Sequence, residues 1–126
     1  MRLLLDTAVF IFAAQTPERL SKRAAAVLKN AENVRQLSSV SLTEIAIKSA
    51  LGKLHMSASD VQAALEDLLV GILPFTSDHA FRLFDFHSHH GDPFDRQIIA
   101  QAMVEGVPVV TPDVNFGLYK GLKIVW

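Results

Sequence analysis

Five acidic residues stand where a strand ends or a helix begins in this sequence, and their side chains could do chemistry together. Asp6 closes the apolar run LLL, Glu44 lies in SLTE, and Asp113 follows VPVVT by two positions, while Asp92 and Asp95 stand three apart in DPFD. Carboxylates that converge repel one another unless a counter-charge is present. Mg²⁺ or Mn²⁺ fits that need, because both prefer oxygen ligands. The pattern therefore indicates metal-assisted phosphodiester hydrolysis, in which the cation activates water and stabilises charge.

Each of these acids also has a purely structural interpretation. Ser41 and Glu44 match a capping box, in which each side chain satisfies a free backbone amide of the helix start. Asp92 stands before Pro93 as a helix N-cap, and Asp95 lies where a carboxylate favours the helix dipole. The other two acids could cap short turns. Caps explain each junction alone, but Ser, Thr or Asn would serve equally well, whereas this chain places a carboxylate at every one of them.

The elements that must position these acids alternate along the chain. Short apolar runs predict strands, and the run ILPF is placed at a sheet edge by its proline. Longer runs with apolar residues three and four apart predict helices. Such alternation implies crossover connections, and hence a three-layer α/β/α fold with a central parallel sheet of four to five strands. The predicted strands are 2–5, 34–41, 72–75, 107–111 and 122–126, and the predicted helices are 18–32, 41–53, 57–71, 77–87 and 92–106.

In a parallel sheet of this kind the functional crevice lies beyond the carboxyl ends of the strands. Asp6 and Asp113 follow strands directly, and Glu44 lies in the first turn of the helix after the second strand. All three are therefore expected at that edge. Asp95 opens the helix that leads into strand 107–111, so its place at the same edge is an inference from the fold and not from spacing.

Composition narrows the class of protein. The chain has 126 residues, half of them hydrophobic and a fifth charged, which predicts one globular domain over residues 1–126. The absence of cysteine excludes disulfides and thiolate metal sites. No run approaches the roughly 20 apolar residues of a membrane span, so we expect a soluble, cytoplasmic protein without a membrane partner. A net charge of −1 argues against holding nucleic acid by charge alone, but not against nucleic acid as a substrate.

Four blocks of the sequence together resemble PIN-domain proteins, and most closely the VapC-type toxins of bacterial toxin–antitoxin pairs. The blocks are LLLDTAVFIFA, SLTEIAIKSALGKL, HHGDPFDRQIIAQA and VVTPDVNFGLYKGLKIVW, which occur in order from end to end of the chain. The resemblance implies that Asp6, Glu44, Asp95 and Asp113 form the catalytic quartet that carries Mg²⁺ or Mn²⁺. Asp95 is preferred to Asp92 because it stands directly before the run RQIIA.

The resemblance also implies an activity and partners. These are divalent-metal-dependent endoribonuclease activity on RNA, homodimerisation, and inhibition by a cognate antitoxin. Two other classes stay open. One is a non-catalytic module of the same fold that binds RNA or protein. The other is an aspartyl-phosphate receiver or phosphatase-like domain, which would need paired acids near a strand end, where LLLDTAV offers one.

Several polar residues beside the quartet have two interpretations each. Thr7 and Thr111 could orient a metal-bound water or cap a turn, and the same holds for Asn115. Asp92 could support the site from outside the metal shell or serve only as a cap. A cluster of histidines in HSHHGD raises a zinc site in principle, but closely spaced loop histidines rarely supply a complete ligand set, so a polar loop is favoured. These histidines are His87, His89 and His90.

Overall fold

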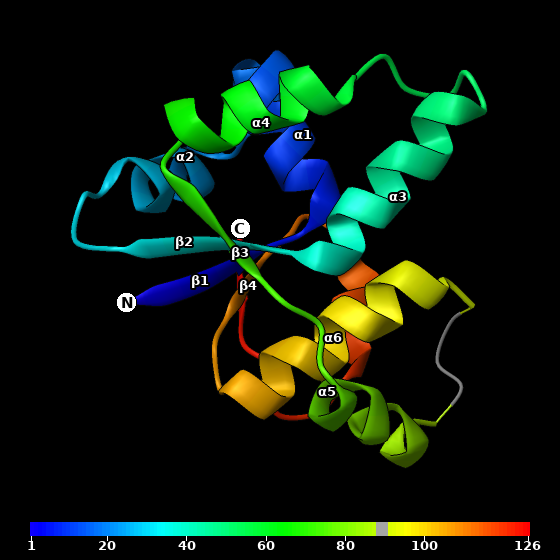
Figure 1. Ribbon diagram of the computed structural model, residues 1–126. Coiled ribbons are helices and arrows are strands. Elements are labelled where there is room, and N and C mark those ends of the chain that lie inside the picture. Colours follow the sequence, from blue (N-terminus) through cyan, green and yellow to red (C-terminus); the bar gives the residue numbers. More distant parts are fainter. Residues whose placement is uncertain (88–90) are drawn as a thin grey trace.

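The computed structural model describes residues 1–87 and 91–126, and in this part of the chain five parallel strands form one sheet (Figure 1). The strands stand in the order β3-β2-β1-β4-β5. Helices cover both faces, so the predicted three-layer α/β/α fold is confirmed. The strands are β1 (Arg2–Leu5), β2 (Val34–Ser38), β3 (Val70–Leu73), β4 (Val109–Val110) and β5 (Ile124–Val125).

The two faces of the sheet build two apolar clusters. In β1, Leu3 and Leu5 face the cluster formed with α1 to α4, whereas Leu4 joins Ile98 and Ile99 of α6 on the opposite face. A central strand that is apolar at every position therefore satisfies both layers. The helices are α1 (Thr7–Gln15), α2 (Lys22–Lys29), α3 (Ser39–Ala50), α4 (Ala58–Asp67), α5 (Ser77–Arg82) and α6 (Pro93–Glu105), with short 3₁₀ turns η1 (Pro17–Arg19), η2 (Leu83–Asp85) and η3 (Val114–Leu118).

The order of strands reverses direction between β1 and β4. The chain runs outward from β1 through β2 to β3, and then returns to place β4 and β5 on the other side of β1. Ligand crevices of open parallel sheets form at such a switch point, beyond the carboxyl ends of the strands. At that point the backbone amide of Asp6 donates to the carbonyl oxygen of Val110 at 3.0 Å. The ends of β1 and β4 are therefore fixed to each other.

Several helix and strand boundaries differ from the sequence prediction, and the helix predicted at 18–32 is divided into η1 and α2. Helix α1 was not predicted, because TAVFIFAAQ is apolar on nearly all sides and carries no amphipathic period. Strand β2 ends at Ser38 instead of residue 41, because the Ser38 hydroxyl accepts a hydrogen bond from the amide of Val40 and starts α3 there. The capping box assigned to Ser41 and Glu44 is therefore wrong, and both lie inside the helix.

The remaining elements follow the prediction more closely. β3 is an edge strand, as predicted, but it begins at Val70, and Pro74 comes directly after it. Helix 92–106 is confirmed as α6, with Asp92 as its N-cap and Gly106 at a φ of 66° after its last turn. None of the helices in the described ranges is long and apolar enough to cross a membrane.

Candidate active site

Asp6 and Asp113 are linked through the hydroxyl of Thr111. Asp6 follows β1 and is only 5% exposed. Thr111 Oγ1 donates to Asp6 Oδ2 at 2.8 Å, and the same oxygen accepts a hydrogen bond from the backbone amide of Asp113 at 3.0 Å. Asp113 Oδ1 in turn accepts from the amide of Asn115 at 2.9 Å and caps η3. The ends of β1 and β4 thereby hold two carboxylates in fixed relation.

A second polar contact joins the starts of α1 and α3. The hydroxyls of Thr7 and Ser41 lie 2.7 Å apart, and both side chains are buried. Ser41 is thus a positioning residue and not the helix cap that the motif SLTE suggests. Its place three residues before Glu44 on one helix face is the signal that could have revealed it.

Glu44 lies on α3 with its two oxygens in different surroundings. Its Oε2 forms an ion pair with Lys48 Nζ at 2.5 Å, one helical turn further on. Its Oε1 is buried and accepts no hydrogen bond from the described residues. A buried carboxylate oxygen without a donor is costly in free energy. Glu44 therefore has one buried oxygen whose charge no donor of the described residues offsets.

Asp92 and Asp95 have the separate places that their spacing suggested. Asp92 Oδ1 accepts hydrogen bonds from the amides of Phe94 and Asp95 at 2.9 and 3.1 Å, so it is the N-cap of α6. Asp95 lies in the first turn of α6 and is half-buried. A crossover helix runs opposite to its parallel strands, so the start of α6 reaches the carboxyl edge where β1 and β4 end.

The pKa of Asp95 reflects its burial and the charges of the other acids. Burial is the main reason that the pKa of Asp95 is raised to about 8. Nearby carboxylates raise this pKa further by disfavouring another negative charge. In decreasing order they are those of Asp6, Asp92, Asp113 and Glu44. Asp6 after β1, Asp113 after β4 and Glu44 on α3 thus all act on the carboxyl group of Asp95.

The pKa of Asp6 is also raised, although a hydrogen bond opposes the shift. Burial raises its pKa to about 6, while the hydrogen bond from Thr111 lowers it, and the charge of Glu44 raises it again. The cluster therefore carries more negative charge than its own surroundings neutralise.

The residues fit a divalent cation by chemistry. The donors are carboxylate oxygens, which suit hard ions such as Mg²⁺ and Mn²⁺, and Glu44 Oε1 is a buried oxygen in need of a positive partner. As the side chains lie, no three acids or histidines within residues 1–87 and 91–126 are arranged to hold a metal ion. Lys48 occupies the other oxygen of Glu44. Of the histidines considered for zinc, His89 and His90 lie outside the described residues.

Comparison with known proteins gives one family and a consistent fold. The PIN domain model matches residues 3–122. No curated protein is a significant match. Similar solved structures include VapBC2 from Rickettsia felis bound to a DNA fragment of its promoter, which is 19% identical over 98% of this chain and 97% of that chain, with a TM-score of 0.72.

Two further solved structures are similar over most of their length. FitAcB from Neisseria gonorrhoeae is 22% identical over 97% of this chain and 95% of its own, with a TM-score of 0.65. VapC20 from Mycobacterium tuberculosis, a sarcin–ricin loop cleaving toxin, is 16% identical over 92% and 93% of the two chains, also with a TM-score of 0.65. At such identities the likeness shows the fold.

Proposed function

This chain belongs to the PIN domain family, and we propose that it is a divalent-metal-dependent endoribonuclease, the toxin of a toxin–antitoxin pair. The observation that carries the proposal is the convergence of carboxylates on Asp95, whose pKa they raise together with burial. The similarity in fold to VapC20, described as a sarcin–ricin loop cleaving toxin, supports RNA as the substrate.

The proposed roles follow from the contacts of each residue. Asp6, Glu44, Asp95 and Asp113 would hold Mg²⁺ or Mn²⁺, which when bound supplies a more acidic water and stabilisation of charge on the phosphodiester. Thr111 orients Asp6 through its hydroxyl, and the Asn115 amide orients Asp113. The Thr7–Ser41 contact sets the position of α3 beside α1. Asp92 fixes the first turn of α6, on which Asp95 stands.

The raised pKa of Asp95 predicts that protons are released when a cation binds. At neutral pH the Asp95 carboxyl group retains a proton for much of the time, because its pKa is about 8. A carboxyl group must lose its proton to become a metal ligand, so cation binding should release protons. Mn²⁺ titration by calorimetry in buffers of different ionisation enthalpy measures that release.

The decisive experiment is cleavage of a labelled RNA by the purified chain. We expect cleavage with Mn²⁺ or Mg²⁺, none with excess EDTA, and loss of both cleavage and growth arrest in Asp6→Ala. Asp78→Ala removes an exposed carboxylate on α5 and serves as the matched control. Full cleavage by an Asp6→Ala, Asp95→Ala double variant would exclude this active site. An RNA-binding chain that takes up no Mn²⁺ would instead indicate the non-catalytic module.

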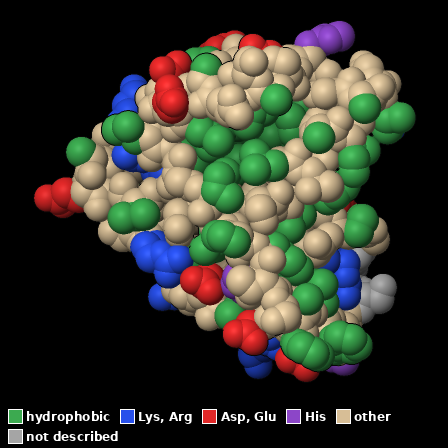
Figure 2. Space-filling view, viewed as in Figure 1, with side chains coloured by type: hydrophobic (Ala, Val, Ile, Leu, Met, Phe, Trp, Pro, Cys, Tyr) green, Lys and Arg blue, Asp and Glu red, His purple; other side chains and the backbone are tan. Residues whose placement is uncertain are grey.

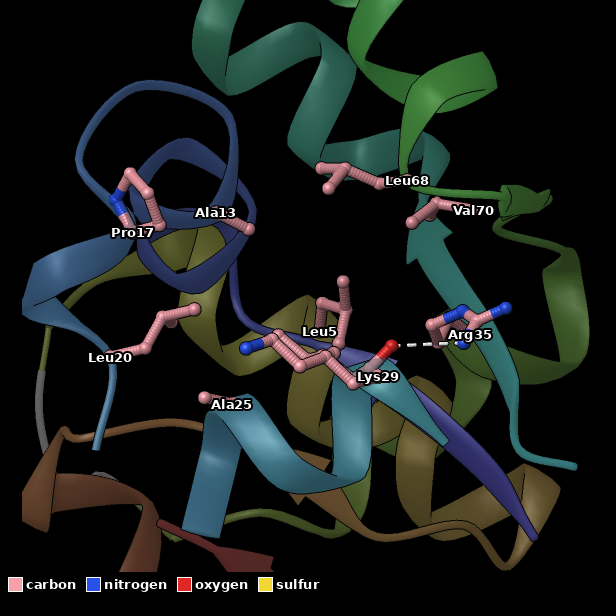
Figure 3. Close-up of a pocket in the computed structure, with 10 residues that line it drawn as sticks. Leu5, Ala13, Pro17, Leu20, Ala25, Lys29, Arg35, Leu68 and Val70 are labelled. Atoms are coloured by element: carbon pink, nitrogen blue, oxygen red, sulfur yellow. Dashed lines mark hydrogen bonds between the residues drawn. The ribbon is translucent and has the colours of Figure 1, made fainter. Parts of the chain in front are cut away.

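The proposal includes an antitoxin as partner, which the similarity to VapBC complexes supports. A cavity of about 190 Å³ between α1, α2 and the sheet has mostly apolar walls, among them Leu20 and Leu68 (Figure 3). Figure 2 shows hydrophobic side chains gathered between α4 and the strands. Lys29 and Arg35 also line the cavity. We propose that it receives an apolar side chain of the antitoxin that is flanked by an acidic residue.

A co-expression experiment tests this partner. The protein encoded directly upstream should co-purify with the wild-type chain and be lost from Leu20→Asp, while Leu118→Asp, at an exposed residue of η3, keeps it. Retention by Leu20→Asp would exclude the cavity as the docking site. Since the proposed substrate is RNA, we place the action of the pair in the cytoplasm.

A second copy of this chain is the other proposed partner. Phe81 and Phe84 stack with ring centroids 6.1 Å apart and are 70% and 84% exposed. Two large exposed aromatic side chains side by side favour burial in an interface. Sedimentation of the wild-type chain as a dimer and of Phe84→Ser as a monomer would support a homodimer through this pair. A wild-type monomer at high concentration would contradict it.

A further inference from the structure

Lys48 contacts the carboxylate cluster from within α3. Its ammonium group pairs with Glu44 Oε2, yet the two side chains differ sharply in exposure, at 45% for Lys48 and 6% for Glu44. The buried carboxylate is held in place by its surroundings, whereas the lysine reaches it from solvent on a flexible stem. The lysine is therefore the member of the pair that can leave.

Glu44 is only half satisfied by this contact. Its Oε1 is buried and accepts no hydrogen bond in the described part of the chain. The charges of Asp92 and Asp95 also act on Lys48, so its ammonium group interacts with these two acids as well as with Glu44. The positive charge of Lys48 thus stands near the negative charges of Glu44, Asp92 and Asp95.

We infer that Lys48 is an exchangeable counter-ion, which holds Glu44 in the absence of a divalent cation and gives Glu44 up when one binds. Lysine suits this role because its ammonium group is a strongly hydrated point charge and does not grip a carboxylate in two places as arginine does. Because the lysine of the pair is half-exposed, solvent screens the contact, and a cation can replace it at little cost in free energy.

After release, the ammonium group stays near the site because Lys48 is only one turn from Glu44 on the same helix. There it would bind a phosphate oxygen of the RNA. This part of the inference rests on the proposed ribonuclease function, whereas the competition for Glu44 needs only a cation.

Metal affinity tests the competition directly. Mn²⁺ binding to the full chain without RNA is measured by calorimetry for the wild type, Lys48→Met and Lys53→Met. Lys53 is exposed and is not the partner of Glu44, so its variant removes the same charge outside the ion pair. We expect Lys48→Met to bind Mn²⁺ about 5-fold more tightly and Lys53→Met to stay within about 2-fold of the wild type. Lys48→Arg keeps a cation beside Glu44 and, because arginine grips a carboxylate in two places, should bind Mn²⁺ no more tightly than the wild type.

The outcomes separate this inference from the proposed function. A wild-type chain that binds no Mn²⁺ contradicts the metal-dependent function itself. A wild type that binds, with Lys48→Met equal or weaker, overturns only the exchange by Lys48, and so does an equal gain in Lys53→Met. If Lys48→Met does not fold, Lys48→Gln takes its place, and circular dichroism establishes folding before each titration.

Two further measurements complete the test. The rise in thermal midpoint on adding Mn²⁺ should be larger for Lys48→Met than for the wild type, because its Glu44 lacks a partner until the cation binds. At saturating Mn²⁺, RNA cleavage by Lys48→Met should fall about 10-fold through loss of the phosphate contact. An unchanged cleavage rate would overturn the phosphate contact.

Discussion

The two ends of α6 carry carboxylates in opposite electrostatic situations. At its start, burial and four nearby acids raise the pKa of Asp95 to about 8. At its end, hydrogen bonds from His79 and then Arg2 hold the pKa of Glu105 below its usual value. His79 Nδ1 accepts from the amide of Thr76, so Nε2 carries the hydrogen and donates to Glu105 Oε2 at 3.0 Å. Arg2 donates to the other oxygen at 3.1 Å.

The carboxylate of Glu105 stabilises the fold, whereas the carboxylates around Asp95 are not neutralised by their surroundings. Glu105 ties β1, α5 and the end of α6 together, and Arg2 extends the network to Gln36 of β2. Both oxygens of this carboxylate have donors. The cluster around Asp95 instead gathers like charges and leaves a buried oxygen of Glu44 without a donor. Such groups with strongly perturbed pKa values are typical of functional sites.

The largest effect is expected from neutralising the start of α6. Asp95→Asn should lower RNA cleavage about 1000-fold, because a proposed metal ligand is lost and with it several kcal/mol of transition-state stabilisation. Glu105→Gln, the matched change at the other end of the helix, should keep cleavage per folded molecule within about 3-fold. Single-turnover cleavage with saturating Mn²⁺ measures both. Equal loss in the two variants would mean that α6 acts only as a scaffold.

For stability, we expect the larger effect at the other end of α6, where His79 contacts Glu105. His79→Ala should lower the free energy of unfolding by about 2 to 3 kcal/mol, because it leaves a cavity beside Phe75 and removes a donor from Glu105. Urea unfolding with EDTA present gives this value. His55→Ala, at an exposed residue, is the control and should change it by less than about 0.5 kcal/mol. A comparable loss in both variants would count against the structural role of the network.

The two ends should also respond to pH with opposite signs. The folded-state pKa of Asp95 lies above its ordinary value of 3.8, so its contribution to stability is present below about pH 4 and is lost as pH rises toward 8. For Glu105 the folded-state pKa is lowered, so its contribution is present at neutral pH and is lost as pH falls through the lowered pKa.

Unfolding in EDTA from pH 4 to 8 tests the contribution of Asp95. Asp95→Asn should stabilise the chain at pH 8 by about 1 to 2 kcal/mol, a range reduced for solvent screening because Asp95 is only half-buried. Asp67→Asn, at an exposed acid of α4, is the control. If the stability gain of Asp95→Asn were equal at pH 4 and pH 8, the raised pKa of Asp95 would be refuted.

The fold was largely predictable from sequence, because β1 and α6 carry clear local signals. LLL is short and uniformly apolar, and DPFD with Gly106 marks both ends of a helix. Helix α1 was not predicted, because a helix that is apolar on nearly all sides has no amphipathic period. The acidic residues were singled out because they stand at strand ends and helix starts, and their roles stay predictions.

What sequence could not supply was the pairing of polar groups across the fold. Thr111 and Asp6 are 105 positions apart in the chain, and only the neighbouring places of β1 and β4 bring them together. Ser41 was misread because the start of α3 depends on where β2 ends. The partner of Glu44 is easier to predict from sequence, since Lys48 follows it by four residues on a helix.

The smallest expected effect sharpens the division between Asp92 and Asp95. Asp92 caps α6 through hydrogen bonds to the amides of Phe94 and Asp95, and Asn is as good an N-cap as Asp. Asp92→Asn should therefore change stability by less than about 0.5 kcal/mol and keep RNA cleavage within about 3-fold. It should also lower the pKa of Asp95, because one of the charges that raise it is gone. If Asp92→Asn lost as much cleavage as Asp95→Asn, Asp92 would belong among the metal ligands, and the helix cap and the active site would be the same group.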